Sequence, residues 1–283
     1  MLLIPFILNL QSDSILLAMH TANVPLKLMI VAFMIIMACA GNKSASCLKF
    51  ERVRVSKNVR MCHDKNSPEC HVSIDILCSK GKDSVSRHIN DAIAEMLFGT
   101  KVNNSSMTHI VDSAACCYTK SYINELSKMY REDAYYSTRR SWYEYRYNVS
   151  SRIEKGRNGI IVYITTLNYY EGGSHSIVQR LVLNIDPKTG RSVQLADMLV
   201  KGYEKSLKEK LLNALMSKTG LNNTDDLHVE GYLYAMGMFV ANNYIIGENG
   251  ITFIYNVFEL APYDKGTIEL TLKYTELKDI LIK

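Results

Sequence analysis

The stretch 251–281 constrains the fold most tightly, because it reads as a strand, a turn, a second strand and a short helix. Residues 251–257 have the period of two that a strand shows, and both of its faces are largely apolar, which is typical of a strand buried on both sides. Turn-forming residues occupy 262–266, and residues 267–274 alternate between apolar and polar side chains, as in a strand with one solvated face. The pattern predicts an antiparallel pair near the C-terminus, with its first strand in the centre of a sheet.

The rest of the chain continues with short strands and amphipathic helices. Alternating segments predict further strands at 50–61, 70–78, 142–153, 160–170, 177–185 and 239–246. Residues at helical spacing predict helices at 84–98, 107–134, 202–218 and 275–281, with Asp83 and Thr275 as N-caps and Gly99 as a stop signal. We therefore expect an α+β protein with antiparallel sheets and helices packed on one face. The order of elements favours two small domains, at 49–150 and 151–283.

The N-terminal region has the features of an export signal. Lys27 precedes an apolar run of 11 residues, which is too short to span a bilayer, and the run ends at Cys39. A small residue directly before a cysteine resembles the lipobox of bacterial lipoproteins, in which the cysteine is lipidated and becomes the mature N-terminus. We therefore expect a signal peptide at 1–38, lipidation of Cys39 and a tether at 39–48, with Met19 or a nearby methionine as an alternative start. An ordinary secretory signal and an uncleaved anchor are the competing interpretations.

The residues after Cys39 predict the compartment. No aspartate follows the cysteine, which by the sorting rules of gram-negative bacteria indicates the outer membrane, facing the periplasm. The protein would then touch the membrane through its lipid anchor only, and export argues against a nucleic-acid partner. The formal net charge of +5 favours acidic partners only mildly.

Six cysteines follow Cys39, and an even number in an exported chain permits disulfides. Cys62 and Cys70 flank a loop and are the candidate disulfide pair, and the competing interpretation is a set of buried thiols. The sequence has no C-x-x-C spacing, no phosphate-binding loop and no nucleophile elbow. It therefore predicts neither a metal nor a cofactor.

Two groups of residues carry a resemblance to a known family. The first is YYEGGSH at 169–175, followed by a strand, the turn DPKTG and LADML before a helix. The second is ELAPYDKG at 259–266, followed by a terminal Y-x-E-L-K motif. Over 169–282 the chain resembles the domain of unknown function at the C-terminus of RsiV-type anti-sigma factors. Residues 48–147 resemble, by element order, the companion domain that is also seen in PdaC-type deacetylases.

The resemblance implies a binding function. In the RsiV branch this pair of domains binds lysozyme, so the expected ligand is a lysozyme-like protein or peptidoglycan. The chain departs from both relatives, because the segment before Lys27 does not resemble a sigma-binding segment and no deacetylase domain is present.

The two motifs supply the candidate ligand-binding residues, which are Glu171, Gly172, Gly173, His175, Glu259, Tyr263 and Asp264. We expect the two turns to lie near each other. A histidine beside a carboxylate suits general acid–base chemistry, whereas the glycines favour a structural role in which His175 is hydrogen-bonded between strands. The sequence therefore predicts no catalytic residue and leaves catalysis by His175 with a nearby carboxylate as the alternative.

Two further surfaces are candidates for partners. The segment 139–157 mixes Trp142 and tyrosines with arginines, which suits a glycan or an acidic surface, although its alternation favours a buried tyrosine face and a solvated arginine face. A basic lysozyme would need an acidic patch on this protein. The candidates for that patch are Glu171, Asp225, Asp226, Glu230 and Glu259.

The sequence as a whole favours a non-enzymatic cell-envelope lipoprotein that binds peptidoglycan or a lysozyme-like hydrolase. An envelope hydrolase or deacetylase that uses His175 with Glu171 or Glu259 is one alternative. A purely structural envelope protein is the other.

Overall fold

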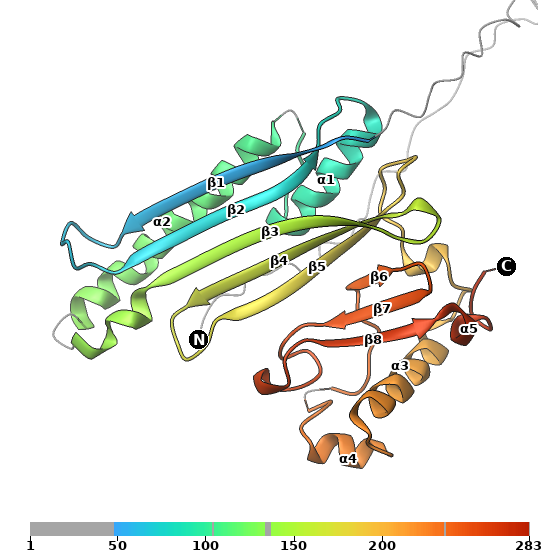
Figure 1. Cartoon of the computed structure of the whole chain (residues 1–283). Helices are drawn as coiled ribbons and strands as arrows, with labels where there is room; N and C mark the ends of the chain where they lie inside the picture. Colours follow the sequence, from blue (N-terminus) through green and yellow to red (C-terminus); the bar gives the residue numbers. More distant parts are fainter. Residues whose placement is uncertain (1–47, 104, 134–136, 235, 283) are drawn as a thin grey trace, which may run out of the picture. The chain divides into compact units, whose positions relative to one another are not determined.

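The computed structural model describes residues 48–103, 105–133, 137–234 and 236–282. The expected signal peptide and Cys39 lie outside the described residues. From residue 48 onward the chain forms one compact unit with a five-stranded and a three-stranded sheet (Figure 1). The α+β class predicted from the sequence is confirmed. Over the described ranges, no helix combines the length and apolar character needed to cross a membrane.

The larger sheet runs in the order β1-β2-β3-β4-β5. Its strands are β1 (Phe50–Arg60), β2 (Glu69–Ser79), β3 (Tyr145–Lys155), β4 (Ile161–Glu171) and β5 (Ile177–Ile185). All neighbours pair antiparallel except β2 and β3, which are parallel. The expectation of purely antiparallel sheets is wrong at this pair, because two helices connect β2 to β3 and return the chain to the starting end of the sheet.

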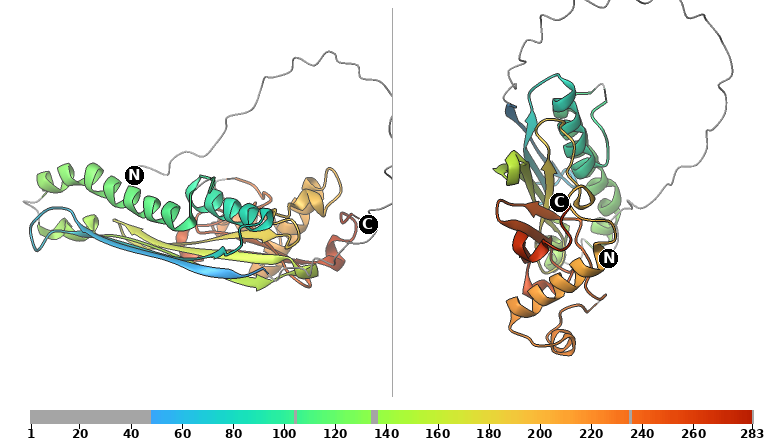
Figure 2. Two further views of the ribbon diagram at one scale, coloured as in Figure 1. Left: turned by 90° about the horizontal axis from the view of Figure 1, so that it is seen from above. Right: turned by 90° about the vertical axis from the view of Figure 1, so that its right-hand side faces the viewer.

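Helices α1 (Ser84–Phe98) and α2 (Met107–Asp133) form this crossover and cover one face of the larger sheet (Figure 2). The predicted caps of α1 are confirmed: the Asp83 carboxylate accepts a hydrogen bond from the Ser86 N–H, and Gly99 adopts the left-handed conformation. Tyrosines of β3 face α2, where Tyr147 stacks on Tyr118 with ring centroids 4.7 Å apart. Burial of these large rings fixes the helices on the sheet.

The segment 139–157 divides between a short 3-10 helix, η1 (Ser137–Tyr143), and β3, so the strand begins later than predicted. Its tyrosine face is packed inward, and Tyr143 is buried. The arginine face is solvated, as in the ion pair of Arg152 with Glu154 at 2.8 Å. The interpretation as a half-buried strand is therefore confirmed.

The smaller sheet has the order β6-β7-β8 and is fully antiparallel. Its strands are β6 (Tyr244–Ile246), β7 (Gly250–Tyr255) and β8 (Ile268–Lys273), so β7 is central, as predicted, and β6 is shorter than predicted. Helix α3 (Glu204–Thr219) packs its buried leucines against this sheet. The short helices α4 (Thr224–Val229) and α5 (Tyr274–Leu277) complete the unit.

The last helix starts earlier than its sequence suggests. Its N-cap is Lys273, the final residue of β8, and not Thr275. The Lys273 N–H donates to the Glu276 carboxylate at 2.7 Å, so a side chain inside the helix takes over the capping role. The predicted domain boundary between residues 150 and 151 falls inside β3, and the chain leaves the larger sheet only after β5.

The two sheets meet at β5, the edge strand of the larger sheet. Asn184 of β5 is buried, and its side chain replaces the ladder that a sixth strand would supply. Its Nδ2 donates to the carbonyl of Tyr244 at 2.7 Å, and its Oδ1 accepts from the N–H of Ile246 at 2.9 Å. One amide therefore satisfies two backbone groups of β6.

Two asparagines of the smaller sheet complete this contact from the other side. Asn243 and Asn256 donate from their Nδ2 atoms to the carbonyl of Arg180 on β5, at 2.7 and 3.1 Å. The Oδ1 of Asn256 accepts from the Arg180 N–H at 2.8 Å. The guanidinium of Arg180 also pairs with Glu269 of β8. Five polar side chains, those of Asn184, Asn243, Asn256, Arg180 and Glu269, thus connect the two sheets.

Replacement of Asn184 by leucine tests this contact. The substitution keeps the approximate size of the side chain but leaves two buried backbone groups without partners, so we expect the free energy of unfolding to fall by about 2–4 kcal/mol. Denaturant unfolding measures the change. Asn168→Leu on the exposed face of β4 is the control and should shift stability by about 0.5 kcal/mol or less. Equal effects of the two substitutions would contradict the proposed role of Asn184.

Candidate functional site

The two sequence motifs come together in space, as predicted. The His175 ring stacks on Tyr263, with ring centroids 4.7 Å apart and an angle of 11° between the planes. Tyr263 begins the 3-10 turn η4 (Tyr263–Lys265), and its hydroxyl donates to the carbonyl of Ser176 at 2.8 Å. His175 is exposed and held by this stacking, so the expected hydrogen-bonded position between strands is wrong.

Phe258 extends this pair into a larger aromatic surface. Its ring centroid lies 5.8 Å from that of Tyr263, and half of the residue is exposed. Its φ of +70° is rare for a bulky residue and is strained. The hydroxyl of Tyr234, a second half-exposed ring, donates to the Phe258 carbonyl at 3.1 Å. We refer to Tyr234, His175, Phe258 and Tyr263 as the aromatic surface.

The strain at Phe258 points to function. Strained backbone persists only where the surrounding structure imposes it, and it concentrates at binding and catalytic sites. Here the strained residue presents an apolar ring to solvent, so its conformation gains no burial in return. Phe258 and Tyr234 were not among the ligand-binding residues predicted from the sequence, because neither is a residue type that marks a turn.

The two glycines of the first motif position His175. Gly172 has φ +78°, and a Cβ at this position would lie 2.5 Å from the Trp142 carbonyl oxygen. Gly173 has φ +92°, with open space around the position of a Cβ. After β4 the chain therefore turns tightly against η1 and then reaches His175, which stacks on Tyr263.

Glu171 lies beside this turn but faces α2. The hydroxyl of Tyr118 donates to Glu171 at 2.7 Å, and burial together with this bond raises the pKa of Tyr118. Among the described residues, no hydrogen bond or ion pair joins His175 to a carboxylate. The arrangement therefore provides a shaped surface, and an acid–base pair at His175 is not assembled.

The remaining candidates are Asp264 and Glu259, and both residues are exposed. Asp264 is exposed in η4, at the edge of the aromatic surface. Glu259 accepts a hydrogen bond from the Asn256 N–H at 2.9 Å, and desolvation of its partly buried carboxylate raises the pKa of Glu259 against the effect of this bond. Glu259 shares a cavity lining with Asn243 and Asn256, two of the residues that connect the sheets.

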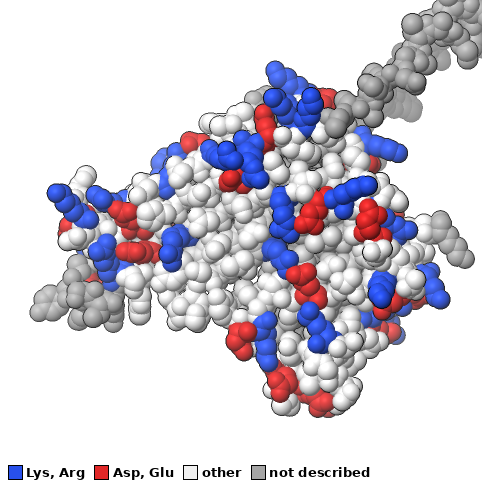
Figure 3. Space-filling view, viewed as in Figure 1, with Lys and Arg blue, Asp and Glu red and all other residues white. Residues whose placement is uncertain are grey.

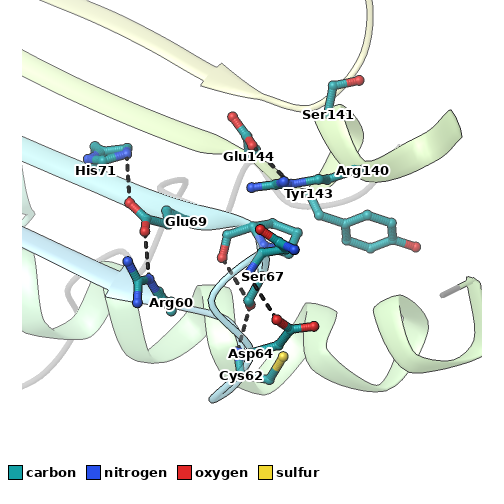
Figure 4. A network of polar contacts seen from close by, with 12 residues as sticks. Arg60, Cys62, Asp64, Ser67, Glu69, His71, Arg140, Ser141, Tyr143 and Glu144 are labelled. Atoms are coloured by element: carbon teal, nitrogen blue, oxygen red, sulfur yellow. Dashed lines mark hydrogen bonds and ion pairs between the residues drawn. The ribbon is translucent and has the colours of Figure 1, made fainter. Parts of the chain in front are cut away.

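The expected disulfide is absent, because Cys62 and Cys70 are free thiols in different environments. Cys62 is exposed in the loop after β1, where its N–H donates to Ser67 Oγ at 2.9 Å (Figure 4). Cys70 points into the core opposite Val59, and burial raises the pKa of its thiol to about 12. Polar contacts stabilise this hairpin end instead, with Glu69 between Arg60 at 2.7 Å and His71 at 3.4 Å (Figure 4).

The described ranges contain no group of three or more histidine, cysteine, aspartate or glutamate side chains that could hold a metal ion.

The two glycines give a matched test of the turn. Gly172→Ala adds a clash with the Trp142 carbonyl to the cost of positive φ, so we expect the free energy of unfolding to fall by about 2 kcal/mol or more. Gly173→Ala meets no atom within 4 Å and should cost about 1 kcal/mol. Denaturant unfolding measures both, and equal losses would refute a close approach at Gly172.

The raised pKa of Glu259 gives a prediction with a definite sign. A group whose pKa is raised on folding stabilises the protein at low pH and loses this contribution as the pH rises through its folded pKa. The stability of Glu259→Gln relative to the wild type should therefore increase between about pH 4 and about pH 7.

Asp279→Asn is the control of opposite sign for this measurement. The hydrogen bond from Lys210 lowers the pKa of Asp279, so its loss should destabilise the protein more at higher pH. Unfolding curves across this pH range give both trends, and a flat or falling difference for Glu259→Gln would disprove the assignment.

Comparisons with known proteins agree with this architecture. Residues 196–275 match the family model described as a protein of unknown function (DUF3298). The crystal structure of a member of this family from Bacteroides fragilis has a TM-score of 0.76 and 26% sequence identity, over 84% of this chain and 94% of that protein. A DUF3298 family protein from Pseudomonas aeruginosa PAO1 has a TM-score of 0.56 at 16% identity, over 84% and 96% of the two chains.

The curated proteins give no match to this chain. The matched residues span α3, α4 and all three strands of the smaller sheet, and the likeness in fold extends over both sheets. Residues 196–275 of this protein are therefore similar to the DUF3298 domain, and the fold around them is similar to that of DUF3298 family members.

Proposed function

We propose that this protein is a non-enzymatic binding module of the cell envelope, and that its aromatic surface holds a glycan, with peptidoglycan as the ligand. The observation that carries the proposal is the meeting of two distant turns at His175 and Tyr263, beside the strained and half-exposed Phe258.

The chemistry of the aromatic surface fits a sugar. Flat rings present apolar faces, and their edges and hydroxyls offer polar contacts, a combination that suits a ligand with both C–H faces and hydroxyl groups. The rim is polar, with Asp264 exposed and Lys265 paired with Glu230 at 3.6 Å. Exposed apolar side chains with a polar rim typically mark a binding site.

A basic lysozyme-like protein fits this surface less well. Positive and negative side chains are mixed over the face seen in Figure 3, and no acidic patch dominates it. Glu171 is bonded to Tyr118, Glu230 is paired with Lys265, and Glu259 accepts a backbone N–H. These three acidic candidates are therefore engaged separately, which favours the glycan over a cationic protein.

The envelope location rests on the N-terminal sequence, which reads as a lipoprotein signal ending at Cys39. Lipidation of this cysteine would place the binding module on the membrane surface, within reach of the cell-wall polymer. The resemblance to the RsiV-type extracytoplasmic domain supports binding as the function.

Binding to insoluble peptidoglycan tests the proposal. We expect the purified protein to sediment with the polymer, and Phe258→Gly to weaken the apparent affinity at least about tenfold, because the exposed ring is lost. Glycine relieves the positive φ, so the free energy of unfolding should stay the same or rise. A loss of binding without a loss of stability separates function from folding.

Met129→Ala is the matched control, because Met129 is equally exposed but lies on α2. It should leave binding unchanged. Sedimentation that is unaffected by Phe258→Gly would refute the assignment of the site. Binding to a basic hydrolase and not to the polymer would replace the glycan by a protein ligand.

A further inference from the structure

A cavity of about 440 Å³ lies between α1, β5 and the segment 239–243. Ligand-binding pockets in proteins have volumes of roughly 300–1,000 Å³, so a small molecule or one residue of a longer chain fits. Its apolar wall consists of Met96, Leu181, Leu183 and Phe239. None of these residues belongs to the aromatic surface.

The edge of β5 supplies a polar element of the cavity. In an antiparallel pair the outward N–H and C=O groups of an edge strand belong to alternate residues. The N–H and C=O of Arg180 bond to Asn256 and Asn243, and the C=O of Asn184 accepts from the Val193 N–H. The N–H and C=O of Val182, midway between Arg180 and Asn184, therefore point the same way. No hydrogen bond from the described residues reaches these outward groups of Val182, which lines the cavity.

The opposite wall carries one charge. Glu259 is the single ionisable residue among the described lining residues, and none of the described lysines or arginines is paired with it. The Asn256 N–H occupies Oε2, which leaves Oε1 available. Asn243, also in the lining, has a buried Oδ1 without a hydrogen-bond partner. Both features call for a ligand that donates hydrogen bonds and carries positive charge.

We propose that this cavity binds a peptide-like ligand that carries an aliphatic ammonium group, such as a lysine side chain. The ligand amide pairs with the backbone N–H and C=O of Val182, as an added strand residue would. Its methylene chain packs on Leu181, Leu183 and Met96, and its ammonium group binds Glu259. This site is independent of the aromatic surface and of the glycan proposed there.

Three small probes separate the contributions. Nα-acetyl-L-lysine N-methylamide carries both the amides and the ammonium, its norleucine analogue lacks the ammonium, and n-pentylamine lacks the amides. Titration followed by amide chemical shifts should show saturable binding of the lysine probe, with the Val182 amide among the largest shifts. The other two probes should bind at least about tenfold more weakly, since each loses one anchor.

Glu259→Gln tests the charge without removing the acceptor for the Asn256 N–H. It should weaken the lysine probe at least about tenfold and leave the norleucine probe unchanged. Glu209→Gln, on the exposed side of α3 and outside the cavity, should change neither. Thermal unfolding of the variants confirms that they remain folded.

Three results would overturn the proposal. They are no saturable binding of the lysine probe up to about 10 mM, equal affinities for the lysine and norleucine probes, or an unchanged affinity in Glu259→Gln. Equal affinities for pentylamine and the lysine probe would show that the ligand amides are not recognised. None of these results would decide whether the aromatic surface binds peptidoglycan, which the sedimentation experiment tests separately.

Discussion

The hydrogen bonds that three asparagine side chains make at the outer edge of β5 decide how the rest of the structure is arranged. They join the two sheets by side chains and not by a continuous ladder. Asn256 directly precedes the segment 257–265, which carries Phe258 and Tyr263, so the same contact places this segment beside His175, just before β5. Asn184 and Asn256 are buried, so loss of their hydrogen bonds would leave buried polar groups unpaired and destabilise the contact between the sheets.

The local elements of this fold could be predicted from the sequence, but the neighbours in the sheet could not. Period-two alternation located the strands, and the Asp83 and Gly99 caps of α1 were correct. The parallel pairing of β2 with β3 has no local signal, since it depends on where α1 and α2 return the chain. The Cys62–Cys70 pairing failed for a related reason: proximity along a hairpin does not determine which side chain faces the core.

The candidate site was predictable only in part. The motifs identified the two turns, and the glycines indicated a bend that the structure places against Trp142. The conformation of Phe258 could not be foreseen, because its positive φ is imposed by tertiary contacts such as the hydrogen bond from Tyr234. The role of Glu259 was also hidden, since its environment is made by residues of α1, β5 and the segment before β6.

The parallel pairing of β2 with β3 also has a consequence for the order of folding. β3, β4 and β5 are joined by short connections, so their ladder closes small loops, whereas Cys70 meets Tyr145 only after both crossover helices are in place. Long loops cost more chain entropy and close later. We expect the β3–β5 meander to form first and the β1–β2 hairpin to dock afterwards with its helices. During synthesis, the edge of β2 that later pairs with β3 would therefore remain without a partner until β3 has been synthesised.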